Sequence, residues 1–201
     1  MPKPYTPNDK WSQKAAELGY RARSVFKLME LDERYKLLRP GMNVLDLGAA
    51  PGSWLQYASE RVGTKGIAIG LDLEAIEPIA KNVRTAKADA LNPTEVREKL
   101  QAFLPEGSSI DIVLSDMAPK TSGIKNVDQW KSVELGTAAA AVAYELLGPG
   151  RFCVLKIFRG ADFDAFLAGL KNDWDVRVKK AQASRDRSFE VYLVMKRKGR
   201  K

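Results

Sequence analysis

The sequence predicts an α/β fold, a doubly wound Rossmann-like sheet of about seven strands with helices on both faces. Short apolar runs alternate with segments of helical spacing along most of the chain, the pattern of parallel strands joined by crossover helices. The first apolar run, residues 44–47, leads into a turn of small residues, 48–52, and then into a helical segment. The last two apolar runs are joined by a polar connection without a helical pattern, so we expect the last strand to be antiparallel.

The N-terminal part of the chain, residues 1–39, is expected to form a basic arm followed by helices. Residues 1–9 are rich in proline, whereas residues 10–39 have helical spacing that is interrupted near Gly19 and Tyr20. An apolar face in the second half of this segment predicts that it docks on the core and presents its basic side chains outward. This face consists of Val25, Leu28, Met29 and Leu31. A solvated amphipathic helix is the alternative interpretation.

Residues 40–195 are expected to form the Rossmann-like core and residues 196–201 a basic tail, all within a single domain, residues 1–201. The strands of the core are predicted at 44–47, 66–71, 83–88, 110–114, 150–158, 174–178 and 189–194. Helices are predicted directly after the small-residue turn and at 93–104, 127–147 and 163–170. Asn92 is a suitable N-cap because Pro93 after it fits the first helical turn.

The composition restricts the chemistry that the protein can perform. The chain has no histidine and a single cysteine, Cys153, in an apolar run, so we expect no metal site and an intrachain disulfide is excluded. A general base must therefore be Lys, Asp, Glu or Tyr. The formal net charge of +8 favours a polyanionic partner such as nucleic acid.

Two further features concern location and assembly. No apolar run approaches the roughly 20 residues that a membrane span needs, and the N-terminal residues lack the apolar core of a signal peptide. We therefore expect a cytoplasmic protein with no membrane partner. No segment indicates a coiled coil or an exposed apolar interface, so we expect a monomer.

The small-residue turn indicates which kind of nucleotide the sheet binds. A dinucleotide fingerprint placed on Gly48 would need glycine at the positions that hold Ala50 and Ser53. Asp72 follows Gly52 by 20 residues, at the end of the next strand, where a carboxylate accepts hydrogen bonds from ribose hydroxyls. These features favour a ribose-bearing ligand without a pyrophosphate, and S-adenosylmethionine fits that description better than NAD.

Charged residues stand at the carboxyl ends of the predicted strands, where open α/β sheets bind ligands. They are Asp72, Asp89, Asp116 and Lys156. Asp89 and Asp116 could alternatively be turn residues, and Asp72 a helix-capping residue beside a structural turn. Lys156 interrupts an apolar strand, so its ammonium must emerge into a cleft or meet an acid, because burying an unpaired charge is costly. Glu190 stands among strand formers, where an ordinary outward-facing position is an equal alternative.

Five motifs in a fixed order resemble those of the FtsJ/RrmJ-type family of S-adenosylmethionine-dependent RNA ribose 2′-O-methyltransferases. The resemblance extends from about Tyr20 to Val194, which is nearly the whole chain. The motifs are YRARSVFKL at 20–28, LDLGAAPG at 45–52, SDMAP at 115–119, VLK at 154–156, and ASR at 183–185 with Ser188 and Glu190. Five motifs in the correct order are far more specific than any one of them alone.

The resemblance implies which residues carry the reaction and hold the cofactor. The family's Lys-Asp-Lys-Glu catalytic tetrad falls on Lys27, Asp116, Lys156 and Glu190. Its cofactor contacts fall on Gly52, Trp54, Asp72, Asp89 and Asp116, with Asp72 at the ribose, Asp89 at the adenine amino group and Asp116 near the methionine end. Ser53, Lys120 and Ala181 stand where the family often has Gly, Asn and Pro. None of these departures removes a member of the tetrad.

Methyl transfer to a ribose hydroxyl requires alignment of the reacting atoms and loss of the hydroxyl proton. Lys156 is expected to be either the base or the stabiliser of the developing alkoxide. Desolvation and the ammonium of Lys27 would favour a neutral amine at Lys156, whereas Asp116 and Glu190 would oppose it. The two acids are therefore expected to orient the lysines and the ribose.

The expected partner is RNA, and the short chain without an appended domain favours a uridine in large-subunit (23S-type) ribosomal RNA. A tRNA anticodon-loop ribose is the alternative substrate. A non-catalytic RNA-binding module and a small-molecule O-methyltransferase are the rival functions. The candidate phosphate contacts are Arg21, Arg23, Arg34, Lys36, Lys120, Lys125, Arg185 and Arg187.

Overall fold

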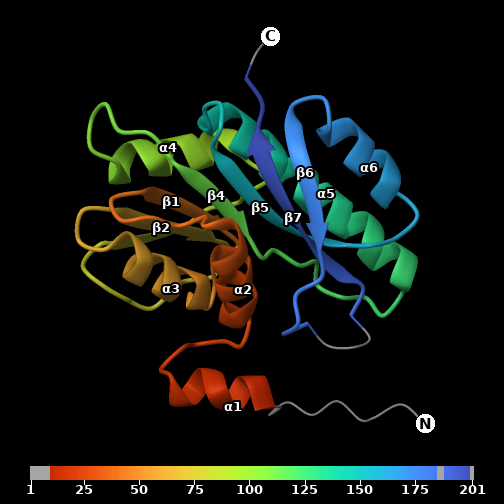
Figure 1. The fold of residues 1–201 in the computed structure, drawn as a ribbon, viewed down its shortest axis with the longest axis horizontal. Coiled ribbons are helices and arrows are strands. Elements are labelled where there is room, and N and C mark those ends of the chain that lie inside the picture. The colour runs from red at the N-terminus through yellow and green to blue at the C-terminus, as the bar shows by residue number, and fades with distance from the viewer. Residues whose placement is uncertain (1–9, 185–187, 200–201) are drawn as a thin grey trace.

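The computed structural model describes residues 10–184 and 188–199, which form a seven-stranded sheet with helices on both faces (Figure 1). The strands are β1 (Asn43–Leu47), β2 (Ile67–Asp72), β3 (Val83–Lys87), β4 (Ile112–Ser115), β5 (Phe152–Phe158), β6 (Trp174–Lys179) and β7 (Glu190–Arg197). They lie in the order β3-β2-β1-β4-β5-β7-β6. β1 to β5 pair in parallel, whereas β7 is antiparallel to both of its neighbours, β5 and β6. The predicted fold class and the antiparallel last strand are confirmed.

Each face of the sheet is covered by its own layer of helices. α2 (Val25–Tyr35) and α3 (Ser53–Val62) pack on one face, and α4 (Pro93–Phe103), α5 (Lys125–Leu146) and α6 (Phe163–Leu170) pack on the other (Figure 1). α1 (Lys10–Glu17) lies at one end of the molecule, where its Ala15 packs with Val25 and Phe26 of α2. The predicted break in the N-terminal helical segment is confirmed, because α1 ends before Gly19 and α2 begins after it. No helix in the described part of the chain is long and apolar enough to cross a membrane.

Side-chain alternation along the strands decides which residues face α2 and α3. Val44 packs on that side of the sheet, whereas Leu45 and Leu47 pack on the α4–α6 side. Leu114 and Val154 also face α2 and α3. Alternate residues of a strand share a face. Asp46, Asp116 and Lys156, each two residues after one of these apolar residues, are therefore directed to the same side of the sheet.

Local sequence signals explain most of the element boundaries. The Asn92 side chain caps α4 by accepting a hydrogen bond from Glu95 N at 3.3 Å, as predicted. α5 begins at Lys125, two residues earlier than predicted, because Asp128 accepts hydrogen bonds from the backbone N–H and the hydroxyl of Ser122 and so orders the chain that enters the helix. Cys153 is free and buried in the core, as the sequence predicts.

Candidate active site

The four residues of the predicted tetrad come together as two ion pairs at the carboxyl ends of β4 and β5 and the start of β7. Lys156 Nζ lies 3.0 Å from Asp116 Oδ1, and it also contacts the backbone carbonyl of Asp116. Lys27 Nζ lies 2.5 Å from Glu190 Oε1. Lys27 and Glu190 are both buried, and pairing is what makes such burial tolerable. The tetrad residues therefore support one another electrostatically.

Strand register brings three of these four residues together. Ser115 pairs with Leu155 between β4 and β5, so the residues that follow them, Asp116 and Lys156, are neighbours. Glu190 pairs with Phe158 between β7 and β5, and Phe158 lies two residues after Lys156 on β5. The fourth residue, Lys27, lies in the first turn of α2, which packs on the same face of the sheet as α3.

Tyr192 connects the two ion pairs, and the sequence interpretation did not assign it a function. It is fully buried, and its hydroxyl donates a hydrogen bond to Asp116 Oδ1 at 2.7 Å. Lys27 Nζ lies 5.7 Å from the centroid of its ring. Period-two alternation from Glu190 was the available signal, because it places the side chain of residue 192 on the same face as that of residue 190.

The charges of the site follow from these contacts. Burial is the largest single effect on Glu190 and would raise its pKa. The charge and hydrogen bond of Lys27, with smaller contributions from Ser184 and Lys156, together outweigh burial and lower the pKa. Burial, followed by the negative charges of Asp116 and Glu190, raises the pKa of Tyr192 well above its ordinary value. Tyr192 is therefore a neutral hydrogen-bond donor, and Glu190 is a carboxylate.

A polar cavity of about 240 Å³ opens beside the tetrad. It is lined by Arg23, Lys27, Ser188 and Glu190. The Arg23 guanidinium also donates to the backbone carbonyl of Ala183, which holds it at the cavity wall. The cavity therefore places Arg23 next to the ion pair of Lys27 and Glu190.

The small-residue turn after β1 provides a second, adjacent binding surface. Gly52 has a φ of +106°, and a Cβ at this position would lie 2.8 Å from Ile79 Cδ1. A Cβ on Gly48 would lie 2.2 Å from Met117 Cγ, so the chain passes close to the loop after β4. Asp72 accepts hydrogen bonds from Ala50 N and Glu74 N, both at 2.9 Å, and so joins this turn to the loop after β2.

Trp54 and Asp89 occupy different parts of this surface. The Trp54 indole is buried, and its Nε1–H donates to the Ser24 carbonyl at 2.8 Å. The backbone N–H of Trp54 lies in the first turn of α3, where the N–H groups of a helix have no intrahelical acceptor. Asp89 lies in the loop after β3, where its Oδ1 accepts a hydrogen bond from Leu91 N at 2.9 Å.

Asp46 is a second residue that the sequence interpretation did not select. It is 1% exposed, and no described residue donates a hydrogen bond to either of its carboxylate oxygens. Burial, followed by the negative charges of Asp116 and Asp72, raises its pKa well above the ordinary value. A buried carboxylate without a partner beside two further carboxylates is suited to a cationic ligand. The alternation of β1 could have indicated it, because Asp46 interrupts an apolar strand as Lys156 does.

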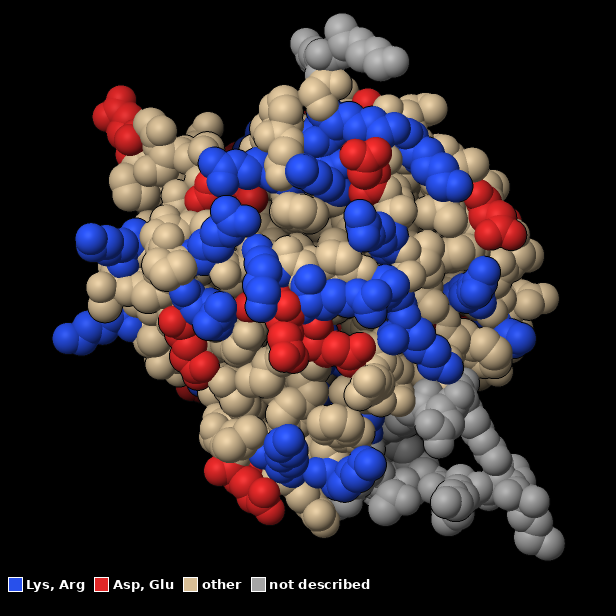
Figure 2. Space-filling view, viewed as in Figure 1, with Lys and Arg blue, Asp and Glu red and all other residues tan. Residues whose placement is uncertain are grey.

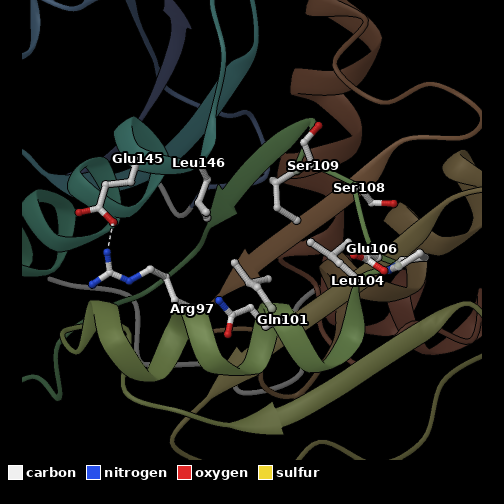
Figure 3. A pocket seen from close by; sticks show the side chains of 12 residues that line it. Arg97, Gln101, Leu104, Glu106, Ser108, Ser109, Glu145 and Leu146 are labelled. Atoms are coloured by element: carbon white, nitrogen blue, oxygen red, sulfur yellow. Dashed lines mark hydrogen bonds and ion pairs between the residues drawn. The ribbon is translucent and has the colours of Figure 1, made fainter.

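A larger cavity of about 530 Å³ lies elsewhere, between α4 and the C-terminal end of α5 (Figure 3). Arg97 and Glu145 form an ion pair at its edge, with 3.2 Å between Nη1 and Oε2. Ile110, which precedes β4, also lines it, so the cavity lies at the amino ends of the strands. None of the predicted site residues lines this cavity.

The basic residues that were candidate phosphate contacts differ in their surroundings. Lys and Arg side chains are spread over the face seen in Figure 2, with Asp and Glu side chains between them. Lys125 Nζ lies 4.2 Å from the centroid of the exposed Phe189 ring. Arg21, in contrast, donates hydrogen bonds to the backbone carbonyls of Pro51, Glu77 and Pro78. Arg185 and Arg187 lie outside the described residues.

The antiparallel β7 between β5 and β6 distinguishes this sheet from that of a dinucleotide-binding dehydrogenase, and acidic residues after β2 and β3 suit a nucleoside ligand rather than a pyrophosphate. The protein is a Rossmann-like methyltransferase that uses S-adenosylmethionine. A family model described as FtsJ-like methyltransferase matches residues 20–198. The chain belongs to the FtsJ-like methyltransferase family.

Known proteins similar to this chain agree with that assignment. A "Ribosomal RNA large subunit methyltransferase E" from Desulfatibacillum aliphaticivorans is 48% identical over 189 residues, covering 92% of this chain and 88% of the relative. A protein of the same name from Syntrophobacter fumaroxidans is 43% identical over 192 residues, covering 94% and 95%. A crystal structure of a Plasmodium falciparum protein assigned as a ribosomal RNA methyltransferase is 31% identical, with a TM-score of 0.79, and covers 90% of this chain and 100% of its own.

Proposed function

We propose that the protein transfers a methyl group from S-adenosylmethionine to the 2′-hydroxyl of a uridine ribose in large-subunit (23S-type) ribosomal RNA. The pairing of Lys27 with Glu190 and of Lys156 with Asp116 in one buried cluster carries this proposal. The names of the relatives support the choice of RNA. We further propose that the chain acts as a single catalytic domain, as a monomer and in the cytoplasm.

The residues at the carboxyl ends of β1 to β4 fit the cofactor. The unpartnered Asp46 carboxylate matches the positive charge of S-adenosylmethionine, and the first-turn N–H groups of α3 match its carboxylate. Gly52 lets the turn after β1 pack closely against Ile76 and Ile79 of the loop after β2, and we assign its backbone to the cofactor. We assign Asp72 to the ribose hydroxyls and Asp89 to the adenine amino group. Asp116 and the backbone of Trp54 complete the site.

The bound cofactor would supply an activated methyl group and leave as S-adenosylhomocysteine, so the protein must orient the ribose and assist loss of its hydroxyl proton to solvent. We assign Lys156 to the reacting oxygen. Its ammonium already donates to Asp116, and a further N–H can donate to the 2′-oxygen and stabilise the negative charge that develops there. Tyr192 and Asp116 fix the position of Lys156 Nζ. Lys27 and Glu190 hold the ribose from the other side.

The RNA backbone is expected at the polar cavity of Arg23 and Lys27, which provides positive charge next to the tetrad. Arg34, Lys36 and Lys120 are exposed and are further candidate phosphate contacts. The target nucleotide must leave the base stack, because the tetrad is buried at the base of the site.

The test is incubation of the protein with methyl-labelled S-adenosylmethionine and three substrates: large ribosomal subunits that lack the modification, naked ribosomal RNA and bulk tRNA. We expect label to enter ribosomal RNA as alkali-stable 2′-O-methyl groups. Nuclease mapping of the labelled RNA identifies the nucleotide. Label confined to tRNA would overturn the proposed substrate and retain the reaction.

Variants at two lysines test whether labelling depends on the tetrad. Lys156→Met should slow labelling by at least about 100-fold, while Lys171→Met, a change at an exposed lysine after α6, should leave it unchanged. Cofactor binding without transfer to any RNA would overturn the proposed reaction and favour a non-catalytic module or a small-molecule substrate.

A further inference from the structure

The guanidinium of Arg21 binds three backbone carbonyls from two loops. Its Nη1 donates to Pro51 O at 3.0 Å and to Glu77 O at 2.9 Å, and its Nη2 donates to Pro78 O at 2.7 Å. Pro51 belongs to the small-residue turn after β1, whereas Glu77 and Pro78 belong to the loop after β2. A single side chain therefore connects the two loops.

The same two loops are connected a second time by Asp72. Its carboxylate accepts a hydrogen bond from Ala50 N in the first loop and from Glu74 N in the second. The aspartate thus binds N–H groups, and the arginine binds C=O groups. Gly52 packs closely against the arginine and the second loop, since a Cβ there would lie 3.1 Å from Arg21 Nη1 and 3.2 Å from Ile76 Cγ2.

The segment that carries Arg21 is itself fixed to the start of α3. Arg21 N donates to Gln56 Oε1 at 2.9 Å, and Gln56 Nε2 donates to Gly19 O at 2.9 Å. Six residues after Arg21, on the same segment, Lys27 joins the tetrad. The cofactor loops, α3 and the segment that bears Lys27 are therefore connected through Arg21 and its neighbours.

We propose that Arg21 is a positioning residue that holds the loops after β1 and β2 in the geometry required to bind the nucleoside part of S-adenosylmethionine. The inference rests on the proposed function, because it takes these loops as the cofactor site. It gives Arg21 a role different from that of a phosphate contact, which the basic sequence around it predicts.

The chemistry of the side chain explains why an arginine is needed. Three carbonyl oxygens from two loops are reached by a planar fork with several fixed N–H donors. A lysine would keep the positive charge but present a single ammonium on a flexible stem, which cannot reproduce this geometry. A phosphate contact, in contrast, tolerates lysine because the attraction is mainly electrostatic. Arg21→Lys therefore distinguishes the two roles.

The experiment measures binding of S-adenosylmethionine and S-adenosylhomocysteine by calorimetry without RNA, for the wild type, Arg21→Lys and Arg21→Ala. We expect both variants to weaken cofactor binding by about tenfold or more, the effect of losing hydrogen bonds from a charged donor. Hydrogen exchange of residues 73–80 in the cofactor-free protein should become faster in both. With RNA present, KM for the cofactor should rise, while kcat at saturating cofactor and KM for RNA should stay near the wild-type values.

The control is Arg39→Ala, which removes an exposed arginine beyond α2 and should leave cofactor binding unchanged. If Arg21→Lys binds the cofactor as the wild type does, and Arg21→Ala weakens only RNA binding, the positioning role is wrong and the phosphate role is correct. A wild-type protein that binds neither cofactor would instead overturn the proposed function. Far-ultraviolet circular dichroism of each variant verifies that it is folded, and Arg21→Lys serves if Arg21→Ala is not.

Discussion

Tyr192 stands directly opposite Lys156 in the antiparallel pairing of β7 with β5, and both side chains bind the carboxylate of Asp116. The Tyr192 hydroxyl donates to Asp116 Oδ1 at 2.7 Å, and Lys156 Nζ lies 3.0 Å from the same oxygen. Asp116 is thereby fixed by donors from two adjacent strands. Tyr192, which is outside the tetrad, therefore shares with Lys156 the carboxylate oxygen that holds the lysine in place.

Tyr192→Phe should slow methyl transfer by about tenfold without abolishing it, because one of the two donors to Asp116 is lost and Lys156 is held less firmly. The ring is retained, so the packing of Trp54 against it, with 6.0 Å between the ring centroids, should persist. Single-turnover rates and calorimetric cofactor binding provide the measurement. A variant with a normal rate would show that the Tyr192 hydroxyl has only a structural role.

Two substitutions at Lys156 separate proton acceptance from charge stabilisation. Lys156→Met removes both and should lower kcat by roughly 10²–10⁴-fold. Lys156→Arg keeps a positive charge that cannot accept a proton, so it should retain activity clearly above that of Lys156→Met. Both variants should bind the cofactor, which establishes that the site is intact. Equal loss in the two folded variants would argue for Lys156 as the proton acceptor.

Asp46→Asn should have opposite effects on stability and on cofactor binding. The pKa of Asp46 is raised in the folded state, so its contribution to stability is fully present below the ordinary pKa of about 3.9 and is lost as pH rises through the folded-state value. At pH 7 the neutral amide of the variant avoids the cost of burying a charged carboxylate. Tm of the cofactor-free protein should therefore increase by roughly 2–4 °C for each 1 kcal/mol gained in the free energy of unfolding. Its affinity for S-adenosylmethionine should fall, because an amide cannot offset the positive charge of the ligand.

The measurement for Asp46 is a set of thermal melts between pH 5 and pH 8 together with calorimetry. Asp175→Asn is the control, because this carboxylate on β6 is 72% exposed and should alter neither quantity. A less stable cofactor-free Asp46→Asn protein at pH 7 would contradict the account of Asp46 as a destabilising, unpartnered carboxylate.

Binding of RNA should depend steeply on salt, whereas binding of the cofactor should not. The net charge of +8 and the basic residues near the tetrad are expected to neutralise several phosphates, so affinity should fall at least about tenfold between 0.05 and 0.2 M salt. Arg23→Ala should reduce the slope of log K against log salt by about 1. Fluorescence anisotropy with a labelled RNA measures both. A slope near zero would mean that phosphate contacts contribute little.

The fold followed closely from the sequence because its elements are encoded locally. The apolar runs give each strand, Asn92 and Pro93 mark the start of α4, and the absence of a helical pattern before β7 predicts its antiparallel direction. The residues of the tetrad could be identified because each occurs in a motif. Their roles, and those of the expected cofactor contacts, stay predictions until the experiments above are done.

The partners of buried polar groups could not be predicted in the same way. Tyr192 in an apolar strand is equally compatible with a core tyrosine, and only the β5–β7 register brings its hydroxyl to Asp116. The basic sequence around Arg21 cannot show whether its guanidinium binds a phosphate or a carbonyl, because Glu77 and Pro78 lie more than 50 residues away. Long-range contacts of this kind depend on the assembled fold.

The position of β7 between β5 and β6 constrains the order in which the protein can fold during its synthesis. This strand is synthesised after all the other strands, yet it fills an interior place in the sheet and carries both Glu190 and Tyr192. A chain still being made on the ribosome can pair β1 to β5 but has no complete tetrad. If the tetrad carries the reaction as proposed, we expect activity only after β7 has inserted between β5 and β6, so a chain that lacks this strand should not methylate RNA.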